Sequence, residues 1–383
     1  MANILKSDFL YETLRERILS GVYSCGNSLP REVDLSQEFG VARNTLRRAL
    51  GELEKEGLIR RVKSKGTFVR GRKGRKSKYL LILNEGGGIE NPYQYIVPYL
   101  QIAAEVTGIG LEIACRNFFQ SLSVSRGAES IRSAGVEGAI VLANNMLPED
   151  PLHAILKESG VPVLLPHGGK WDHEMTGFGV LRIDFAKSLR DALLYLSGLG
   201  HRRIAVLAKE PGESGEAWNR ALQKAGFLRD EREFIAVREY SREAYFAMLR
   251  ELGLSDDPVL LQFSRGTPQE IRRSVESLIQ LPEPPTALIG FSDFYAMYAM
   301  QELKLLGIRI PEEISVLGLC GYPGGAYLSP TLTTIGYNYE KIGWKCLELM
   351  PRLIRIAREG GEMPDVIMEH RLIERKSTAF RKE

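Results

Sequence analysis

The chain has 383 residues, of which 44% are hydrophobic and 26% are charged, and its formal net charge at pH 7 is +3. This composition is typical of a globular protein with a sizeable core. No run of 18 apolar residues occurs, and the amino terminus lacks the charged-then-apolar order of a secretory signal. The sequence therefore argues against a membrane or secreted protein and predicts a cytoplasmic one.

The first 40 residues contain two short helical patterns. Leu10, Leu14 and Ile18 recur every four residues and predict a first helix over about residues 6–20. Pro30 is interpreted as the first position of a second helix, where a missing N–H is tolerated. Gly40 is expected to close the turn that follows, because that turn needs a residue free to adopt a positive φ. This order is typical of a helix-turn-helix unit.

The next helix separates apolar from polar side chains. Its apolar residues recur at i, i+3, i+4 and i+7, namely Leu46, Ala49, Leu50 and Leu53. Arg43, Asn44 and Arg47 then face outward near its amino end. Arginine and asparagine can make paired hydrogen bonds to guanine and adenine edges in the major groove. The alternative is a solvated charged face without a partner.

A short hairpin follows this helix. Residues 58–62 and 67–70 are rich in β-favouring side chains, with Ser64, Lys65 and Gly66 between them. They predict the two strands and the tip of a wing. Lys65 makes this tip basic and is expected to lie near DNA phosphates, unless it is an ordinary turn lysine.

Residues 1–70 are predicted to form a winged helix-turn-helix domain, and its segment from Tyr11 to Val69 resembles the GntR family of bacterial transcription regulators. The residues that carry the resemblance include Tyr11, Leu14, Ile18, Leu29, Pro30, Glu32, Phe39, Gly40, Arg43, Thr45, Arg47, Glu56, Gly57, Lys65, Gly66, Thr67 and Phe68. The resemblance implies that Arg43 and Arg47 contact bases or nearby phosphates, that Asn44 and Thr45 support them, and that the wing tip contacts DNA. Val33 stands where the family commonly has a basic residue, and Arg31 is expected to replace that contact.

The charge distribution supports a nucleic-acid partner. Residues 1–78 contain 18 Lys and Arg against 9 Asp and Glu, whereas the remaining residues contain 33 against 39. A basic module of this kind attracts double-stranded DNA by releasing condensed counterions. Residues 71–78 contain no apolar side chain and are interpreted as a basic hinge linker.

Beyond this linker, residues 79–383 alternate between short apolar runs and amphipathic segments. The candidate strands are residues 79–83, 111–114, 139–142, 161–165, 204–207, 259–263, 287–291 and 315–319. The candidate helices include residues 95–107, 185–196, 267–281 and 293–306. The alternation predicts an α/β fold with buried parallel strands, and the length fits two such lobes. A ligand would then bind in the cleft between them.

The same region resembles the effector domain of the lactose-repressor and galactose-repressor family, itself similar to periplasmic binding proteins. The matching words are Ile183-Asp184, Tyr195-Leu196, residues 199–205, Pro285-Thr286-Ala287, Ser292-Asp293, Gly307-Ile308, residues 311–316, Gly318, residues 330–335 and Gly343. Together with the GntR-like segment, the architecture looks like the arabinose-repressor type, in which a GntR-like domain is fused to such an effector domain. The resemblance implies a two-lobed sensor and dimerisation domain that closes on a small molecule.

Aromatic and polar residues in loops of this region are candidates for the effector site. Asp293 is retained from the family pattern, whereas a usual arginine aligns with Ser214 and a usual aspartate aligns with Cys320. The other candidates are Tyr93, Tyr95, Trp218, Arg265 and Tyr322. A carbohydrate site needs such aromatic faces and hydroxyl-pairing groups. The alternatives are that Asp293 caps a helix and that the aromatic residues pack in the core.

Motifs for catalysis, metals or cofactors are poor, and we expect none of these. The run Gly86-Gly87-Gly88 lacks a Walker lysine, and no strand leads directly into the segment 212–215. The four cysteines have no metal or redox spacing and are expected to be reduced thiols.

The sequence as a whole predicts a ligand-responsive DNA-binding regulator, most simply a repressor of a carbohydrate-use operon. A homodimer would meet a pseudo-palindromic operator. A small-molecule-binding protein or enzyme with an incidental basic module, and a DNA binder whose second part only dimerises, stay open as alternatives.

Overall fold

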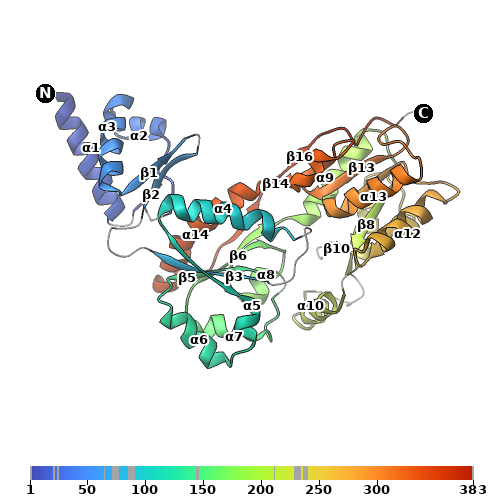
Figure 1. The fold of residues 1–383 in the computed structure, drawn as a ribbon, viewed down its shortest axis with the longest axis horizontal. Helices are drawn as coiled ribbons and strands as arrows, with labels where there is room; N and C mark the ends of the chain where they lie inside the picture. The colour runs from blue at the N-terminus through green and yellow to red at the C-terminus, as the bar shows by residue number, and fades with distance from the viewer. Residues whose placement is uncertain are drawn as a thin grey trace.

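The computed structural model describes residues 2–19, 22–23, 26–63, 65–70, 77–84, 91–143, 146–210, 212–227, 234–235 and 240–381. A small helical domain stands at one end of the molecule, followed by a first lobe and then a second lobe (Figure 1). Most of the expected linker, the glycine run at 86–88 and Cys25 lie outside the described residues.

The small domain, which we call the reader, has three helices and a two-stranded antiparallel wing. These elements are α1 (Ala2–Leu19), α2 (Glu32–Glu38), α3 (Arg43–Glu56), β1 (Ile59–Val62) and β2 (Gly66–Val69). Gly40 and Gly57 adopt φ of +60° and +78°, as the turn and the end of α3 require. The expectation for Pro30 is wrong: Arg31 is extended, so α2 begins at Glu32 and Pro30 lies before the helix.

The first lobe is built on a six-stranded sheet in which every neighbouring pair is parallel, in the order β15-β7-β6-β5-β3-β4. Its strands are β3 (Lys78–Leu83), β4 (Gly110–Cys115), β5 (Gly138–Leu142), β6 (Val163–Gly168), β7 (Gly179–Ile183) and β15 (Asp365–Met368). Its helices are α4 (Tyr93–Thr107), α5 (Arg116–Gln120), α6 (Val124–Ser133), α7 (Pro151–Ser159), α8 (Asp172–Thr176) and α14 (Tyr339–Glu359).

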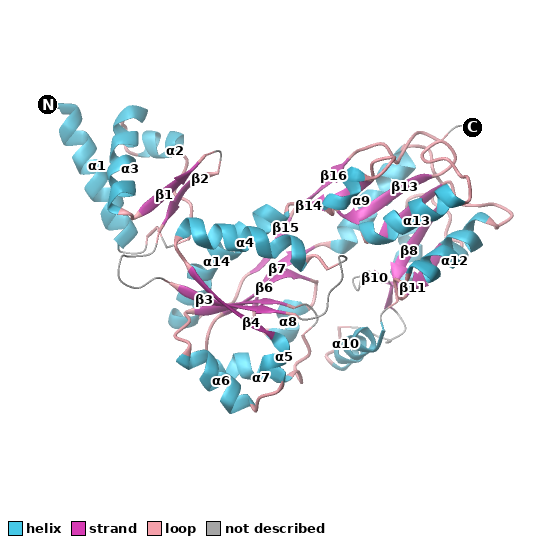
Figure 2. Cartoon of the chain, in the orientation of Figure 1, coloured by secondary structure: helices cyan, strands magenta, loops and turns pink. Residues whose placement is uncertain are grey.

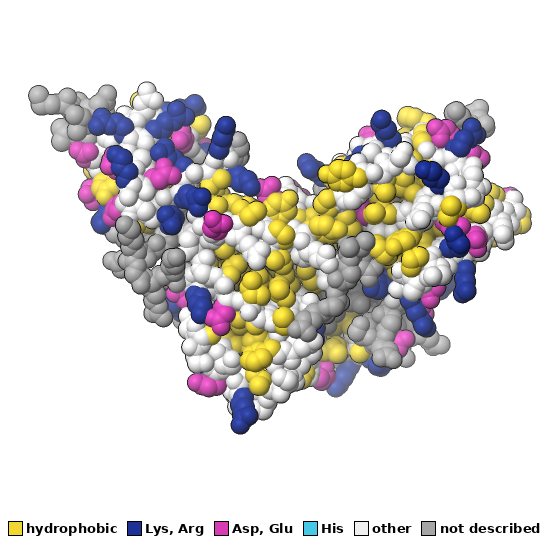
Figure 3. Space-filling model, in the orientation of Figure 1, with side chains coloured by type: hydrophobic (Ala, Val, Ile, Leu, Met, Phe, Trp, Pro, Cys, Tyr) yellow, Lys and Arg dark blue, Asp and Glu magenta, His cyan; other side chains and the backbone are white. Residues whose placement is uncertain are grey.

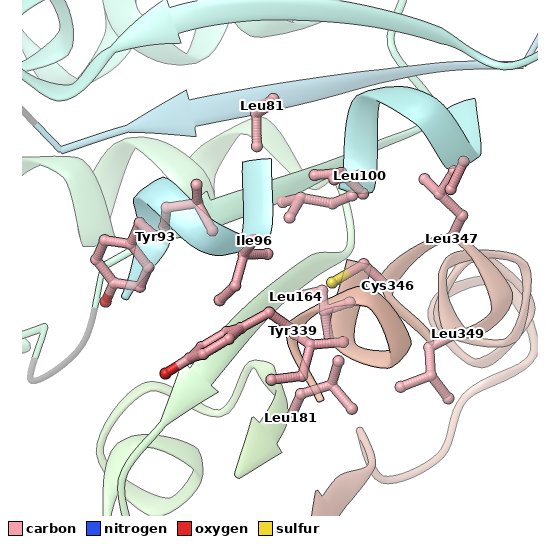
Figure 4. Packing of buried hydrophobic residues seen from close by; sticks show 14 of the residues in the cluster. Leu81, Tyr93, Ile96, Leu100, Leu164, Leu181, Tyr339, Cys346, Leu347 and Leu349 are labelled. Atoms are coloured by element: carbon pink, nitrogen blue, oxygen red, sulfur yellow. The ribbon is translucent and has the colours of Figure 1, made fainter. Parts of the chain in front are cut away.

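Helices cover both faces of this sheet, which explains why its strands are apolar on both sides. Leu81 on β3 belongs to the cluster that α4 and α14 complete, while its neighbours Leu80 and Ile82 pack with α6 and α7 on the other face. Figure 4 shows the cluster under α4 and α14, with the rings of Tyr93 and Tyr339 at one end of it. These two helices therefore lie between the sheet and the reader (Figure 2).

The second lobe repeats this plan. Its sheet has the order β11-β8-β12-β13-β14-β16, and only β16 is antiparallel to its neighbour among the described strands. The strands are β8 (Ile204–Lys209), β11 (Leu261–Ser264), β12 (Ala287–Phe291), β13 (Ser315–Cys320), β14 (Thr333–Tyr337) and β16 (His370–Ile373). A separate pair joins β9 (Phe234–Ile235) and β10 (Tyr240–Ser241). The helices are α9 (Phe185–Gly198), α10 (Gly212–Lys224), α11 (Arg242–Glu251), α12 (Pro268–Ile279), α13 (Asp293–Leu305) and the 3-10 turns η1 (Pro258–Leu260) and η2 (Pro323–Tyr327).

The chain passes between the lobes three times, from β7 to α9, from β14 to α14 and from β15 to β16. At the first passage Asp184 accepts the Lys187 N–H at 2.8 Å and starts α9, and at the second Asn338 accepts the Lys341 N–H at 2.9 Å and starts α14. The expected α/β fold with a reader and a two-lobed parallel-sheet domain is confirmed.

Candidate nucleic-acid interface and effector site

Helix α3 has the two faces that the sequence predicts. Leu46, Ala49 and Leu53 are fully buried in the reader core, while Arg43, Asn44 and Arg47 are exposed on the other side. Thr45 is buried, so its side chain faces the interior rather than solvent. Lys and Arg side chains gather on the visible face of the reader (Figure 3).

One of these arginines already has an intramolecular partner. Arg47 Nε donates to Glu32 Oε2 at 2.8 Å, which holds the guanidinium between α2 and α3. Its side chain is still 58% exposed, so the other nitrogens of its fork can face a base. Arg31 is exposed directly before α2, on the same helix-turn-helix unit. The exposed arginine face is therefore formed by α3 together with the start of α2.

The wing rests on α14 of the first lobe. Lys65 pairs with Glu340, and its Nζ lies 5.5 Å from the centre of the Trp344 ring. The Phe68 ring packs on Trp344 with a centroid distance of 4.4 Å. A Cβ atom at Gly26 would lie 3.0 Å from the Leu347 carbonyl oxygen, so the reader backbone also approaches α14 closely. Lys65, which the sequence predicts to lie near DNA, thus contacts helix α14 of the first lobe in this structure.

We expect Glu340→Gln to raise the affinity for DNA of any sequence about two- to fivefold. Lys65 cannot pair with Glu340 and with a phosphate at once, and an exposed pair of this kind is worth roughly 0–1 kcal/mol. Fluorescence anisotropy with a labelled duplex would measure the change. The matched control is Glu348→Gln, which removes a carboxylate of the same helix that is paired with Lys345. Equal affinities for both variants and wild type would contradict the prediction.

Between the lobes, aromatic side chains gather where the strands of both sheets end. His167 near the end of β6 lies 6.3 Å from Tyr93 and 5.7 Å from Phe185, measured between ring centres. Tyr337 and Tyr339, on either side of the second passage, lie 6.2 and 6.4 Å from the same imidazole. We call these five residues the inter-lobe cluster. Carboxyl ends of parallel strands are where ligands of α/β folds bind.

A second group of rings adjoins this cluster. Tyr95 of α4 lies 4.8 Å from Tyr322, which follows β13, and 5.6 Å from Tyr339. The Tyr339 hydroxyl donates to the Cys320 carbonyl at 2.8 Å. Burial raises the pKa of the Cys320 thiol and keeps it protonated. The structure therefore brings together four of the sequence candidates, namely Tyr93, Tyr95, Cys320 and Tyr322.

Asp293 lies beside these residues but is fully buried. Its carboxylate accepts the Thr334 hydroxyl at 2.6 Å and the Tyr322 N–H, so it joins the start of α13 to β14 and to the loop after β13. Gly318 makes room for it, because a Cβ there would lie 2.1 Å from Asp293 Oδ1. The helix cap position belongs to Ser292, not to Asp293. Burial raises the pKa of Asp293 to about 7, although its hydrogen bonds oppose the shift.

Two of the remaining candidates, Trp218 and Arg265, make no hydrogen bond, ion pair or ring contact with this group among the described residues. Trp218 is 1% exposed on α10, and Arg265 is an exposed side chain that pairs with Glu210 at 3.3 Å. The side chain of Ser214 lies outside the described residues. His167, Phe185, Tyr337 and Tyr339 were missed by sequence reasoning. The signal that could have found them is their position directly at the ends of strands that lead from one lobe to the other.

A serine, a histidine and an aspartate meet near the passages between the lobes. His370 lies 3.3 Å from Ser188 Oγ and 2.8 Å from Asp191 Oδ2, and Ser188 also contacts the Tyr337 hydroxyl. The serine hydroxyl donates to the Asp184 carbonyl at 2.7 Å. This arrangement links β16, α9 and β14 near the passages between the lobes.

A basic helix-turn-helix reader joined to a two-lobed sensor defines a transcription regulator. Residues 6–69 match the family model "Bacterial regulatory proteins, gntR family", and residues 193–378 match "Periplasmic binding protein-like domain". Within the described residues, no helix has both the length and the apolar character needed to span a bilayer.

Similar proteins agree with this class. The chain is 26% identical to the arabinose metabolism transcriptional repressor of Geobacillus stearothermophilus, over 94% of both chains. A solved LacI-family regulatory protein from Chloroflexus aggregans is 22% identical, with a TM-score of 0.58 over 79% of this chain and 99% of that one. A complex of the transcriptional regulator CelR with cellobiose has a TM-score of 0.56 and 22% identity, over 91% of this chain and all of that one. The chain thus joins a gntR-type helix-turn-helix domain to a periplasmic-binding-protein-like domain with a LacI-like fold, and its family matches and relatives are transcription regulators rather than enzymes.

Proposed function

We propose that this regulator represses genes for carbohydrate use and that a small carbohydrate bound between its lobes changes its affinity for an operator. The observation that carries the proposal is that helix α14 contacts both the inter-lobe cluster and the wing of the reader. Its first residue, Tyr339, belongs to the inter-lobe cluster, and Glu340 and Trp344 contact the wing. The name of the Geobacillus relative supports the carbohydrate class of the effector.

The mechanism requires that the effector distinguish two arrangements of the lobes. A ligand shifts an equilibrium only by its difference in affinity for the two states. Tyr339 contacts Cys320 and Tyr322 of the second lobe, so a change in lobe closure acts on the first turn of α14. The wing contacts the next turns of the same helix. A change in lobe closure can therefore be transmitted to the wing through the packed side chains of α14, without the linker.

The DNA partner we propose is a pseudo-palindromic operator that two copies of the chain bind together in the cytoplasm. One reader presents a single α3 and can read one half-site, so a second copy supplies the other. The DNA contacts are assigned to Arg31, Arg43, Asn44, Arg47, Lys65 and Gly66, with Thr45 supporting α3 from the interior.

Binding of a labelled duplex from upstream of the protein's own gene tests this proposal. We expect at least a tenfold change in affinity when one of a panel of neutral monosaccharides and disaccharides is added, and the same sugar should raise the melting temperature. The control is the double variant Arg43→Ala/Arg47→Ala, which should lose DNA binding and keep the thermal shift. A sugar that binds without any change in DNA affinity would contradict the proposal.

A further inference from the structure

His167 is a buried polar side chain without a structural partner. It is 2% exposed, and neither ring nitrogen has a hydrogen-bond partner in any other described residue. Burial lowers its pKa to about 4, so at pH 7 the imidazole is neutral and has one N–H donor and one bare acceptor nitrogen. Buried polar atoms are nearly always satisfied, so an exception of this kind calls for an explanation.

The backbone is distorted at this residue. His167 adopts a φ of +62°, which is uncommon for a side chain other than glycine. The register between β6 and β7 also shifts here: Pro166 faces Leu181 and Gly168 faces Arg182, which leaves His167 as the extra residue of a bulge. Bulges and positive φ values re-aim side chains and are concentrated at functional sites. The strand therefore turns this imidazole toward the aromatic side chains where the two lobes meet.

The surroundings of His167 define what it can recognise. Tyr93 of the first lobe, Phe185 at one end of the first inter-lobe passage, and Tyr337 and Tyr339 at the two ends of the second surround it. Aromatic faces pack on the C–H face of a sugar ring, and a hydroxyl both accepts and donates, so it can satisfy an imidazole nitrogen of either kind. None of these five side chains carries a positive charge at neutral pH, so the group offers no cation to an anionic ligand.

We propose that His167 is the specificity-determining residue of the effector site and that the effector is an uncharged saccharide whose hydroxyls bind the imidazole. This inference rests on the proposed function, since it names the recognition residue and ligand class of the same site. The site should bind neutral sugars in preference to uronic acids and sugar phosphates.

Thermal melting and titration calorimetry of the full chain test the proposal, with L-arabinose, D-galactose and cellobiose against D-galacturonate and galactose 6-phosphate as probes. At least one neutral sugar should stabilise the wild type, and the anions should not. His167→Phe should weaken binding of that sugar more than tenfold, and it should raise the melting temperature of the free protein by about 2 °C or more, because it removes unsatisfied polar atoms. His167→Gln keeps a donor and an acceptor and should retain part of the affinity.

The matched control is His201→Phe, because His201 is equally buried but uses both ring nitrogens, with Thr286 Oγ1 at 2.9 Å and the Ala379 carbonyl at 3.1 Å. This variant should melt at a lower temperature and keep the sugar response. Unchanged sugar binding in His167→Phe, or a wild type that responds only to the anions or to no probe, overturns the inference. Sugar binding through His167 without an effect on DNA would refute the proposed function alone.

Discussion

Arg43→Ala and Arg47→Ala should each reduce operator affinity by about 1–3 kcal/mol, or roughly five- to 150-fold, and relax the preference for operator over random DNA. Both side chains project from the amino-terminal half of α3, opposite its buried stripe. Arg47 must also leave or share its contact with Glu32, so its net effect should be the smaller of the two. Operator affinity can be measured with a duplex selected from a random library. Competition with random DNA then measures the preference for operator.

The matched control for this experiment is Arg273→Ala on α12, an exposed arginine of the second lobe far from the reader (Figure 1). It removes the same charge and should leave both affinities unchanged. If the reader arginines only attract phosphates, operator and random DNA would lose affinity equally. That result would reject base reading by Arg43 and Arg47 and leave a purely electrostatic contact.

Asp293 should make the stability of the protein depend on pH in a direction unusual for a carboxyl group. Its folded-state pKa of about 7 lies above the ordinary value of 3.8, so the folded protein holds a proton that the unfolded chain releases. The resulting stability is complete below pH 4 and is lost as the pH rises through 7. The difference between the two pKa values corresponds to at most about 4 kcal/mol.

Melting temperatures of wild type and Asp293→Asn from pH 5 to pH 8 would measure this effect. The variant cannot titrate, so the advantage of wild type over it should shrink as the pH rises. Burial raises the pKa values of Tyr95, Cys320 and Tyr322, which lie around the carboxyl, so these groups keep their protons over this range. The lowered pKa values of His167 and His201 act in the opposite direction but are common to both proteins. A constant difference would show that Asp293 stays ionised when folded.

The reader and the lobes could be predicted from sequence because their signals are local. The stripe on α3 and the apolar runs of β5 and β12 repeat with helix and strand periods, and the structure has elements there. Residues 259–263 were predicted as strand, yet Pro258 and the Asp257 side chain begin a 3-10 turn, and β11 starts only at Leu261. The edge strands β15 and β16 were missed, because their half-exposed residues become strands only by pairing with β7 and β14.

The effector site was harder to predict because it depends on distant pairings. Asp293 looked like a ligand acceptor, and only the fold shows that Thr334 and Tyr322 already use its carboxylate. The distortion at His167 depends on the register between two strands, which no local pattern records. The contact between Lys65 and Glu340 joins residues 275 positions apart. Such contacts follow from the assembled sheets and not from periodicity.

The returning carboxyl-terminal segment has a consequence for how the protein is made. Strand β15 completes the edge of the first lobe, β16 completes the edge of the second, and Ser377 is buried where it donates to Val316 and accepts from Thr333. A chain leaving the ribosome can therefore close the reader core early, whereas neither lobe is complete until β15 and β16 have been translated. A nonsense mutation before β15 would leave the reader able to fold while both lobes lack an edge strand, so such alleles should lose the effector response and retain at most the weak DNA binding of a single reader.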